Sequence, residues 1–367
     1  MEPLDIAIPV ASAFAVAAVT TPFVGRFARA IGAIDRPSDR GVNQRPDMPL
    51  CGGLAVAGAF AVGLYAALEL SEHGPDPRVR GLLLGGLVML ATGMYDDRFG
   101  MNAWQKLSGQ VLAAGIAISQ GFRFPYFTNP FTQGLVDVPE GLVWAVTLVW
   151  IVGITNALNL LDGLDGLAAG VSAIIAATLA AIAFQGDQTF VLLAGVALTG
   201  ALLGFLPHNF SPARIFLGDT GALFVGYTLS LLALECYRRV SLITLIVPML
   251  ALAVPILDTL MSIVRRIVQH KPIFKADRQH MHHRLLAYEG SPRAAVTQFY
   301  LLTSAFCMIA VSFTRLQGIT AAVFLVTVLA LTVRLLWNLG VIGRTADEDA
   351  PAQDPTSAQR HTEGGAS

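Results

Sequence analysis

The sequence predicts an all-α fold, that of a polytopic integral membrane protein with about eleven transmembrane helices. Hydrophobic residues make up 54% of the 367 residues and charged residues only 13%, against about 25% charged residues in soluble domains. Apolar stretches also recur at lengths that approach the ~20 residues a helix needs to cross a bilayer. These stretches lie near residues 4–25, 51–70, 81–95, 107–121, 141–155, 167–185, 189–206, 221–236, 241–264, 298–313 and 319–339.

The first apolar stretch lacks a basic leader and a small-residue cleavage site, so we expect a retained helix. After Gly340 the sequence becomes polar and rich in Asp, Glu, Gln, Ser and Pro, a composition typical of disorder. We therefore predict a transmembrane domain over residues 1–340 and a disordered cytoplasmic tail over 341–367. Cys51, Cys236 and Cys307 fall in or beside apolar stretches, which favours a packing role over disulfides or a metal cluster.

Basic residues favour the cytoplasmic side of a membrane. With the N-terminus outside, most of the 24 Lys and Arg residues fall in loops on the inner side, with Arg238 and Arg239 as a local exception. An odd number of helices then leaves the C-terminus inside. All segments with unusual polar clusters face the cytoplasm in this topology: residues 32–50, 96–106, 156–166, 207–220 and 265–297.

The first polar cluster runs from Asn156 to Ala169. Asn156, Asn159 and Asp162 follow one another at a spacing of three, so on a helix they share one face and can converge on one site. Polar groups beside long apolar segments are costly and rare, which favours a functional role. The alternative is that Asp162 and Asp165, each followed by glycine, only form turns.

The second cluster is the adjacent pair Asp96 and Asp97, where the third apolar stretch meets the cytoplasm, with Lys106 downstream. Two neighbouring carboxylates repel each other, and near a membrane one resists ionisation unless a cation lies close. The pair therefore indicates a metal site, a catalytic base, or both. A solvated helix end is the alternative interpretation.

The third cluster, residues 209–221, combines an amide, a cation, an aromatic ring and an acid flanked by glycines. The guanidinium of Arg214 suits phosphate oxygens, because its planar fork donates two hydrogen bonds at once. Phe216 can stack on a base, Asn209 offers an amide, and Asp219 can hold a hard cation. A loop that merely connects two spans is the alternative.

The fourth cluster contains His280, His282, His283 and Arg284. Three histidines within four residues cannot all reach one zinc ion from a single helix, and zinc usually takes three or four ligands from a closed set. Contacts to phosphate and sugar fit better. A solvated histidine-rich loop is the alternative.

Together the clusters offer acids for a divalent cation and cations for phosphates on one membrane face. Magnesium, which manganese can replace, is the expected metal because it binds through oxygen ligands and substrate phosphates. No Walker loop is present, which argues against ATP-driven pumping. A multi-pass transporter is the rival class, but its acids are expected near the middle of the membrane.

The residues resemble the polyprenyl-phosphate N-acetylhexosamine-1-phosphate transferases, often called the MraY/WecA type, from about residue 35 to 288. The motifs that carry the resemblance are Asp35-x-Pro-x-x-Arg40 with Pro49-x-x-Gly52-Gly53, Asp96-Asp97-Arg98 with Lys106-Leu-x-x-Gln110, the 156–169 stretch, Pro212-Ala-Arg-Ile-Phe-x-Gly-Asp219-x-Gly221, Pro255-x-x-Asp258-Thr with Arg265-Arg266, and His280-x-His-His-Arg284. Two positions depart from the pattern. Asn43 stands where many members carry His, and Gly100 where some carry a third acid.

The resemblance implies transfer of a sugar-1-phosphate from a UDP-sugar to undecaprenyl phosphate, with release of UMP, at the start of a lipid-linked envelope glycan. The form His282-His283-Arg284-Leu285 resembles the branch that uses UDP-N-acetylglucosamine. The rival branch is the phospho-N-acetylmuramoyl-pentapeptide transferase. The family's mechanism is argued both as direct attack and through a covalent aspartyl intermediate, and the sequence does not choose between them.

The resemblance also implies a role for each site residue. Asp96 is the expected catalytic base and Asp97 its support, while Asp219 and Asn159 are the expected magnesium ligands. The uridine site is assigned to Asp165, Asn209 and Phe216. Contacts to phosphate and sugar are assigned to Asn156, Asp162, Lys106, Arg214, His280, His282, His283 and Arg284.

The expected partners are the UDP-sugar donor, the polyprenyl phosphate acceptor and the bilayer, with a homodimer left open. A net charge of −1 gives the chain no general attraction to nucleic acid. We expect a multi-pass protein of the cell membrane with a cytoplasmic active site.

Overall fold

The computed structural model describes residues 3–35, 47–70, 76–124, 127–128, 135–136, 138–236, 246–268 and 281–314, with scattered helical positions between 320 and 334. The chain forms two units, Met1–Leu316 and Gln317–Ser367. All elements discussed below belong to the first unit. The predicted tail, residues 341–367, lies outside the described residues.

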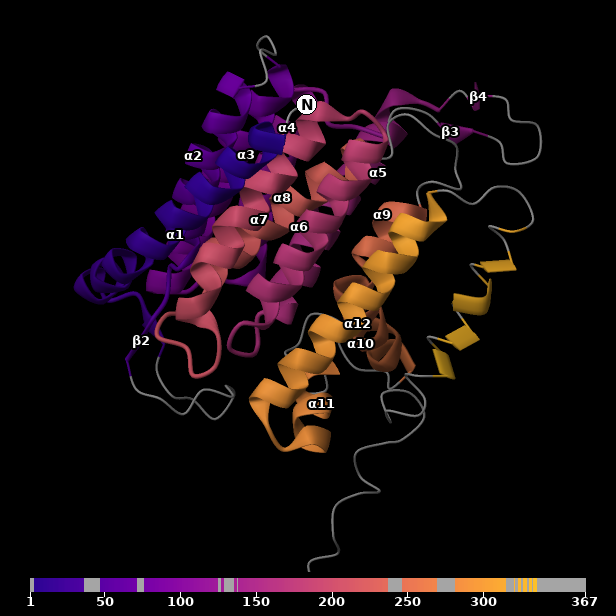
Figure 1. The fold of residues 1–367 in the computed structure, drawn as a ribbon. Helices are drawn as coiled ribbons and strands as arrows, with labels where there is room; N and C mark the ends of the chain where they lie inside the picture. The colour runs from indigo at the N-terminus through magenta and orange to yellow at the C-terminus, as the bar shows by residue number, and fades with distance from the viewer. Residues whose placement is uncertain are drawn as a thin grey trace, which may run out of the picture. The chain divides into compact units, whose positions relative to one another are not determined.

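The described part of the first unit is helical apart from two small antiparallel ribbons (Figure 1). Its helices are α1 (Pro3–Ile31), α2 (Gly53–Leu70), α3 (Pro77–Phe99), α4 (Ala103–Ser119), α5 (Glu140–Leu161), α6 (Leu167–Gln185), α7 (Thr189–Asn209), α8 (Gly218–Cys236), α9 (Ile246–Ala251), α10 (Ala253–Val268), α11 (Met281–Glu289) and α12 (Pro292–Phe313). The ribbons pair β1 (Ile34–Asp35) with β2 (Met48–Pro49), and β3 (Phe127–Thr128) with β4 (Leu135–Val136).

Six described helices are long and apolar enough to cross a membrane, namely α1, α2, α5, α6, α7 and α12. The predicted class, a helical membrane protein, is therefore confirmed. The larger number of about eleven spans stays a prediction. The three cysteines are free and buried, as predicted.

One predicted span, residues 241–264, is divided in the structure. Helix α9 ends at Ala251 and α10 begins at Ala253, with Leu252 between them. Pro255 provides the physical reason, because proline has no N–H to donate and its ring clashes with the carbonyl four residues earlier, here that of Ala251. The predicted polar segment 265–297 also contains a short helix, α11.

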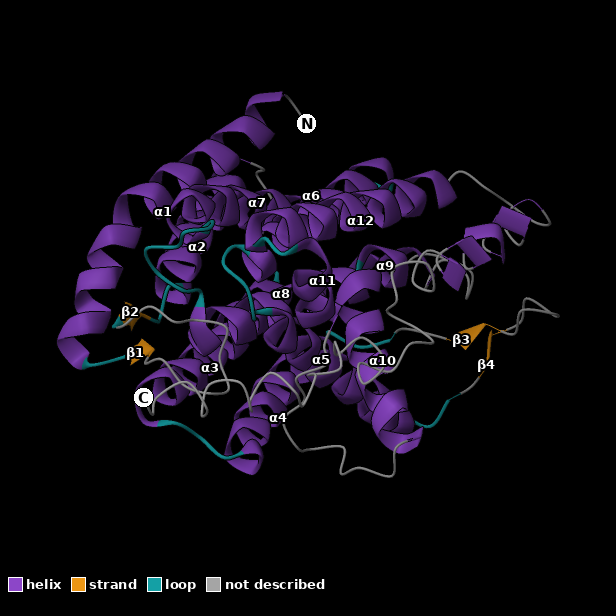
Figure 2. Cartoon of the chain, turned by 90° about the horizontal axis from the view of Figure 1, so that it is seen from below, coloured by secondary structure: helices purple, strands orange, loops and turns teal. Residues whose placement is uncertain are grey.

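Helix α8 is the most enclosed element near the site, packed against α2, α3 and α5 (Figure 2). Every residue of α8 is buried except Asp219, in its first turn. The approach of α2 is close because glycines meet there: a Cβ on Gly53 would lie 2.2 Å from the Cα of Gly221. Farther along, the Tyr227 hydroxyl donates a hydrogen bond to the carbonyl of Gly81 in α3 at 2.8 Å. This packing fixes the end of α8 that carries Asp219.

Candidate active site

Four helices bring polar side chains together around the ammonium group of Lys106 in α4. Lys106 Nζ lies 2.8 Å from Asp96 Oδ2 of α3, 2.9 Å from Asp219 Oδ2 of α8 and 3.3 Å from Asn159 Oδ1 of α5. Asn159 Nδ2 in turn donates a hydrogen bond to Asp219 Oδ1. We call these four residues the Lys106 cluster. It contains both predicted metal ligands and the predicted base.

The turn between α3 and α4 places Asp96 and Lys106 on the same side. Gly100 ends α3 with a φ of 74° and a ψ of 143°, a conformation that only glycine adopts easily. Asn102 then begins α4 with a capping box, in which Asn102 and Gln105 bond reciprocally. Within this turn the Met101 N–H donates to Asp96 Oδ1 at 2.7 Å. The glycine that departs from the family pattern thus has a conformational reason in this chain.

Asp97 points to the start of α8. Its carboxylate accepts the backbone N–H groups of Asp219 at 2.8 Å and Thr220 at 3.1 Å, and the Thr220 hydroxyl at 2.6 Å. Gly218 allows this approach, since a Cβ there would lie 2.6 Å from Asp97 Oδ2. Asp97 therefore caps α8 from a neighbouring helix and is a positioning residue for Asp219.

The end of α5 divides its three predicted site residues. Asn159 lies in the last turn and reaches the Lys106 cluster, whereas Asn156, one turn earlier, forms a reciprocal amide pair with Gln110 of α4, at 2.7 Å and 3.1 Å. Asp162 follows the helix end at Leu161. Burial, with the charges of Asp219 and Asp97 in addition, raises the pKa of Asp162 to about 8. The position of Asp162 therefore favours the protonated form of its carboxyl.

The residues predicted to form the uridine site all border the connection between α7 and α8. Asp165 accepts the N–H of Ala213 at 2.9 Å, and Asn209 Nδ2 donates to the carbonyl of Ile215 at 3.0 Å. The other amide atom of Asn209, Oδ1, is buried and has no hydrogen-bond partner among the described residues. The half-buried Phe216 is held through its backbone, whose N–H donates to the Pro49 carbonyl at 2.9 Å.

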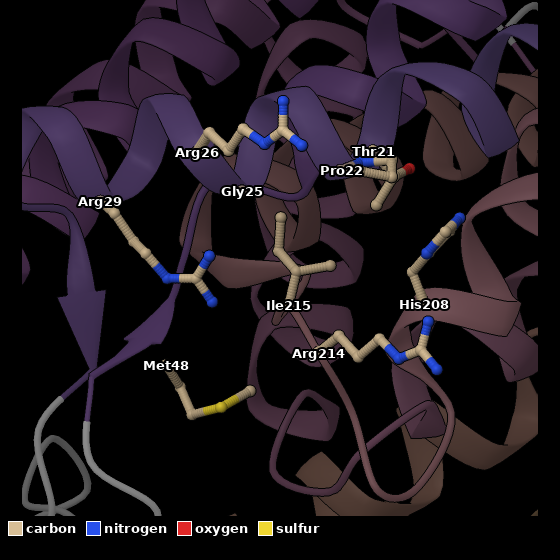
Figure 3. Close-up of a pocket in the computed structure, with 9 residues that line it drawn as sticks. All are labelled: Thr21, Pro22, Gly25, Arg26, Arg29, Met48, His208, Arg214 and Ile215. Carbon is tan, nitrogen blue, oxygen red and sulfur yellow. The ribbon is translucent and has the colours of Figure 1, made fainter.

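Arg214 lies apart from the Lys106 cluster, in a separate cavity of about 440 Å³ (Figure 3). Arg26 and Arg29 of α1 and His208 of α7 line the same cavity. We call it the basic pocket, defined by these four basic residues. Sequence reasoning missed Arg26, Arg29 and His208, although two arginines three residues apart at the end of an apolar stretch were a visible signal.

The histidine cluster is only partly described. His280 lies outside the described residues, and of His282 and His283 only the position in the first turn of α11 is defined. The first residue of that helix, Met281, donates its N–H at 2.6 Å to the buried Asp258 of α10. Arg284 is half-buried, and burial, together with the charge of Arg265, lowers its pKa. Asp258 was part of a sequence motif, but its position opposite the start of α11 was not predicted.

Two carboxylates and one amide, each from a different helix, gather around one ammonium group in a helical membrane protein, and this arrangement is the candidate site. Comparison with known proteins makes the class specific. Residues 79–237 match the family model described as glycosyl transferase family 4. The chain belongs to the polyprenyl-phosphate N-acetylhexosamine-1-phosphate transferase family.

Three relatives illustrate this membership. The chain is 37% identical over 324 residues to the probable undecaprenyl-phosphate N-acetylglucosaminyl 1-phosphate transferase of Bacillus subtilis. The aligned residues cover 87% of each chain. It is 32% identical over 310 residues to the decaprenyl-phosphate N-acetylglucosaminephosphotransferase of Mycobacterium leprae, covering 77% of each. A phospho-N-acetylmuramoyl-pentapeptide-transferase of Lacticaseibacillus paracasei is 35% identical over 266 residues, 66% of this chain and 79% of the relative.

Proposed function

We propose that this protein transfers N-acetylglucosamine-1-phosphate from UDP-N-acetylglucosamine to undecaprenyl phosphate and releases UMP. The observation that carries the proposal is the Lys106 cluster, in which the ammonium group of Lys106 contacts the carboxylates of Asp96 and Asp219 beside the start of α8. Relatives named for this transfer, similar over 87% of the chain in one case, support the same reaction. Membership in this family also argues against the transporter.

In this reaction an oxygen of the lipid phosphate forms a bond to the sugar-bearing phosphorus of the donor. The bond from that phosphorus to the oxygen of UMP breaks, and UMP leaves with the electron pair. Asp96 would orient the lipid phosphate or accept its proton, because one carboxylate oxygen is held by the Met101 N–H and the other by Lys106. Lys106 would also offset charge on the phosphates.

The donor set around Lys106 suits a magnesium ion. Three oxygens, from Asp96, Asp219 and Asn159, already surround the ammonium group. No three His, Cys, Asp or Glu side chains in the described part of the chain form a complete metal site by themselves. This pattern agrees with magnesium, which usually takes one or two carboxylates and completes its shell with water and substrate phosphates. When bound, the ion would neutralise charge on the pyrophosphate.

The donor sugar is tested by assaying purified protein with undecaprenyl phosphate, magnesium and one of two donors. We expect UMP release with UDP-N-acetylglucosamine and little release with UDP-muramoyl-pentapeptide. A matched reaction without the lipid acceptor measures background hydrolysis. Turnover of the pentapeptide donor alone would reassign the chain to the other branch, and consumption of neither donor would contradict the proposal.

The proposed active site faces the cytoplasm, as the positions of basic residues favour. Single cysteines at Ser71, Asn129 and Ser291 in a cysteine-free background test this topology. An impermeant thiol reagent added to intact cells should label the first two and not the third. Labelling at position 291 before lysis would place the site on the opposite face.

A further inference from the structure

The basic pocket contains positive charge that the described protein does not neutralise. Elsewhere in the described chain, Lys106 contacts two carboxylates, Arg78 contacts Asp76 and Glu235, and Arg123 lies 3.5 Å from Glu140. Arg26, Arg29 and Arg214 have no carboxylate partner among the described residues. All three are exposed, so water screens their repulsion in part, but three guanidinium groups lining one cavity favour an anion between them.

The α1 arginines have one structural explanation, and it covers only part of the pocket. Arg26 and Arg29 lie in the last two turns of α1, where positive side chains interact favourably with the helix dipole. Arg214 comes from the α7–α8 connection and gains nothing from the end of α1. Figure 3 shows Arg29 and Arg214 on either side of Ile215. Cations from two distant segments thus line one cavity.

Two hydrogen bonds connect the segments that form the wall of the pocket. His208 Nε2 lies 3.1 Å from the carbonyl oxygen of Ala18, which ties the end of α7 to α1. The Arg214 N–H donates to the carbonyl of His208 at 2.8 Å, and this bond closes the loop that carries the arginine. A cavity of about 440 Å³ between such segments has the size of a small-molecule site, typically ~300–1,000 Å³.

A strip of exposed apolar side chains lies beside the pocket. Val19, Phe23 and Phe27 follow one another at a spacing of four on α1, and they are 63%, 60% and 47% exposed. The guanidinium of Arg26 lies over the ring of Phe23, 5.4 Å from its centroid. On a membrane-crossing helix such a strip faces lipid, so the pocket adjoins hydrocarbon on one side. A ligand with an anionic head and apolar chains would satisfy both surfaces.

We propose that the basic pocket binds the phosphodiester headgroup of an anionic membrane phospholipid, with the acyl chains along Val19, Phe23 and Phe27. Arginine forks match phosphate oxygens and form charge-assisted hydrogen bonds. The site is separate from the Lys106 cluster and does not depend on the identity of the donor sugar. It would hold the cytoplasmic end of α1 and the α7–α8 connection against the bilayer surface.

The test is a binding titration of the full-length protein in a neutral detergent. The probes are short-chain phosphatidylglycerol, short-chain phosphatidylcholine, inorganic phosphate and undecaprenyl phosphate, with the dissociation constant taken from the shift of melting temperature with ligand concentration. We expect saturable binding of phosphatidylglycerol, weakened at least about tenfold in R26Q/R29Q. The matched control R80Q/R123Q removes two exposed arginines outside the pocket and should bind like the wild type.

R26K/R29K keeps the charge and serves as a folding control. Its affinity for phosphatidylglycerol should lie between the affinities of the wild type and R26Q/R29Q. Equal phosphatidylglycerol affinity in R26Q/R29Q and wild type would overturn the proposal. So would inorganic phosphate that binds as tightly as the lipid, because the apolar strip would then contribute nothing. Undecaprenyl phosphate that displaces phosphatidylglycerol competitively would assign the pocket to the acceptor instead.

Discussion

The Lys106 cluster and the basic pocket handle charge in opposite ways, although the connection that carries Arg214 of the pocket leads directly into α8, which carries Asp219 of the cluster. In the cluster one cation is surrounded by three oxygens from three other helices, two of them carboxylate oxygens, so opposite charges meet and offset each other in part. In the pocket three arginines gather without a carboxylate among the described residues. The first arrangement is complete enough to order its own side chains. The second has no neutralising partner among the described residues, and the two sites are expected to respond differently to substitution.

The strongest test of the cluster is Asp219→Asn. This change removes the charge that faces Lys106 and weakens the proposed magnesium site, so we expect turnover to fall at least about 100-fold. UMP release from purified protein measures it, with magnesium or with EDTA. Asp187→Asn is the matched control, because Asp187 is exposed in the loop between α6 and α7 and is not a member of the Lys106 cluster. Full turnover of Asp219→Asn, or of the wild type in EDTA, would contradict the metal assignment.

A smaller effect is expected at Asp97, which acts on the cluster through α8. Asp97→Asn keeps the shape but replaces one acceptor oxygen by a donor that faces backbone N–H groups and the Thr220 hydroxyl. We expect a loss of about 1–3 kcal/mol in unfolding free energy and about a tenfold drop in kcat, because Asp219 loses its fixed position.

Asp76→Asn provides the matched control for this prediction, since Asp76 caps the start of α3, at the other end of that helix from Asp97. It should lower stability without the same drop in kcat at saturating lipid and metal. Unfolding in increasing denaturant and initial rates separate the two quantities. An Asp97→Asn protein with unchanged stability and unchanged kcat would mean that the cap does not position Asp219.

The sequence was sufficient to predict the helical membrane class, and its clusters included all four members of the Lys106 cluster. It succeeded there because acids and amides are conspicuous beside apolar stretches, where polar groups are costly. It did not reveal the basic pocket, because Arg26 and Arg214 are far apart in the chain and only the packing of α1 against α7 brings their segments together. The predicted span 241–264 was wrong for a local reason, because Pro255 breaks this apolar stretch into α9 and α10.

Asn156 shows the same limit at the level of one side chain. Its spacing from Asn159 and Asp162 predicts a shared site, but the structure pairs its amide with Gln110, which is 1% exposed. The period of a helix says which residues share a face. It does not say which of them find a partner on the next helix, because that depends on how α4 and α5 pack.

The finest test separates these two roles of Asn156, contact with substrate and attachment of α5 to α4. We compare Asn156→Ala, Gln110→Ala and the double variant. Hydrogen bonds between membrane helices contribute about 0.6 kcal/mol on average and up to about 1.7 kcal/mol in double-mutant cycles, so the amide pair should give a coupling energy in that range. If the pair only positions Asn159, both single variants change kcat alike, and the double variant adds little to either. An increase of KM in Asn156→Ala that Gln110→Ala does not share would instead place the Asn156 amide on the donor, because loss of helix attachment affects both variants whereas loss of a substrate contact affects one.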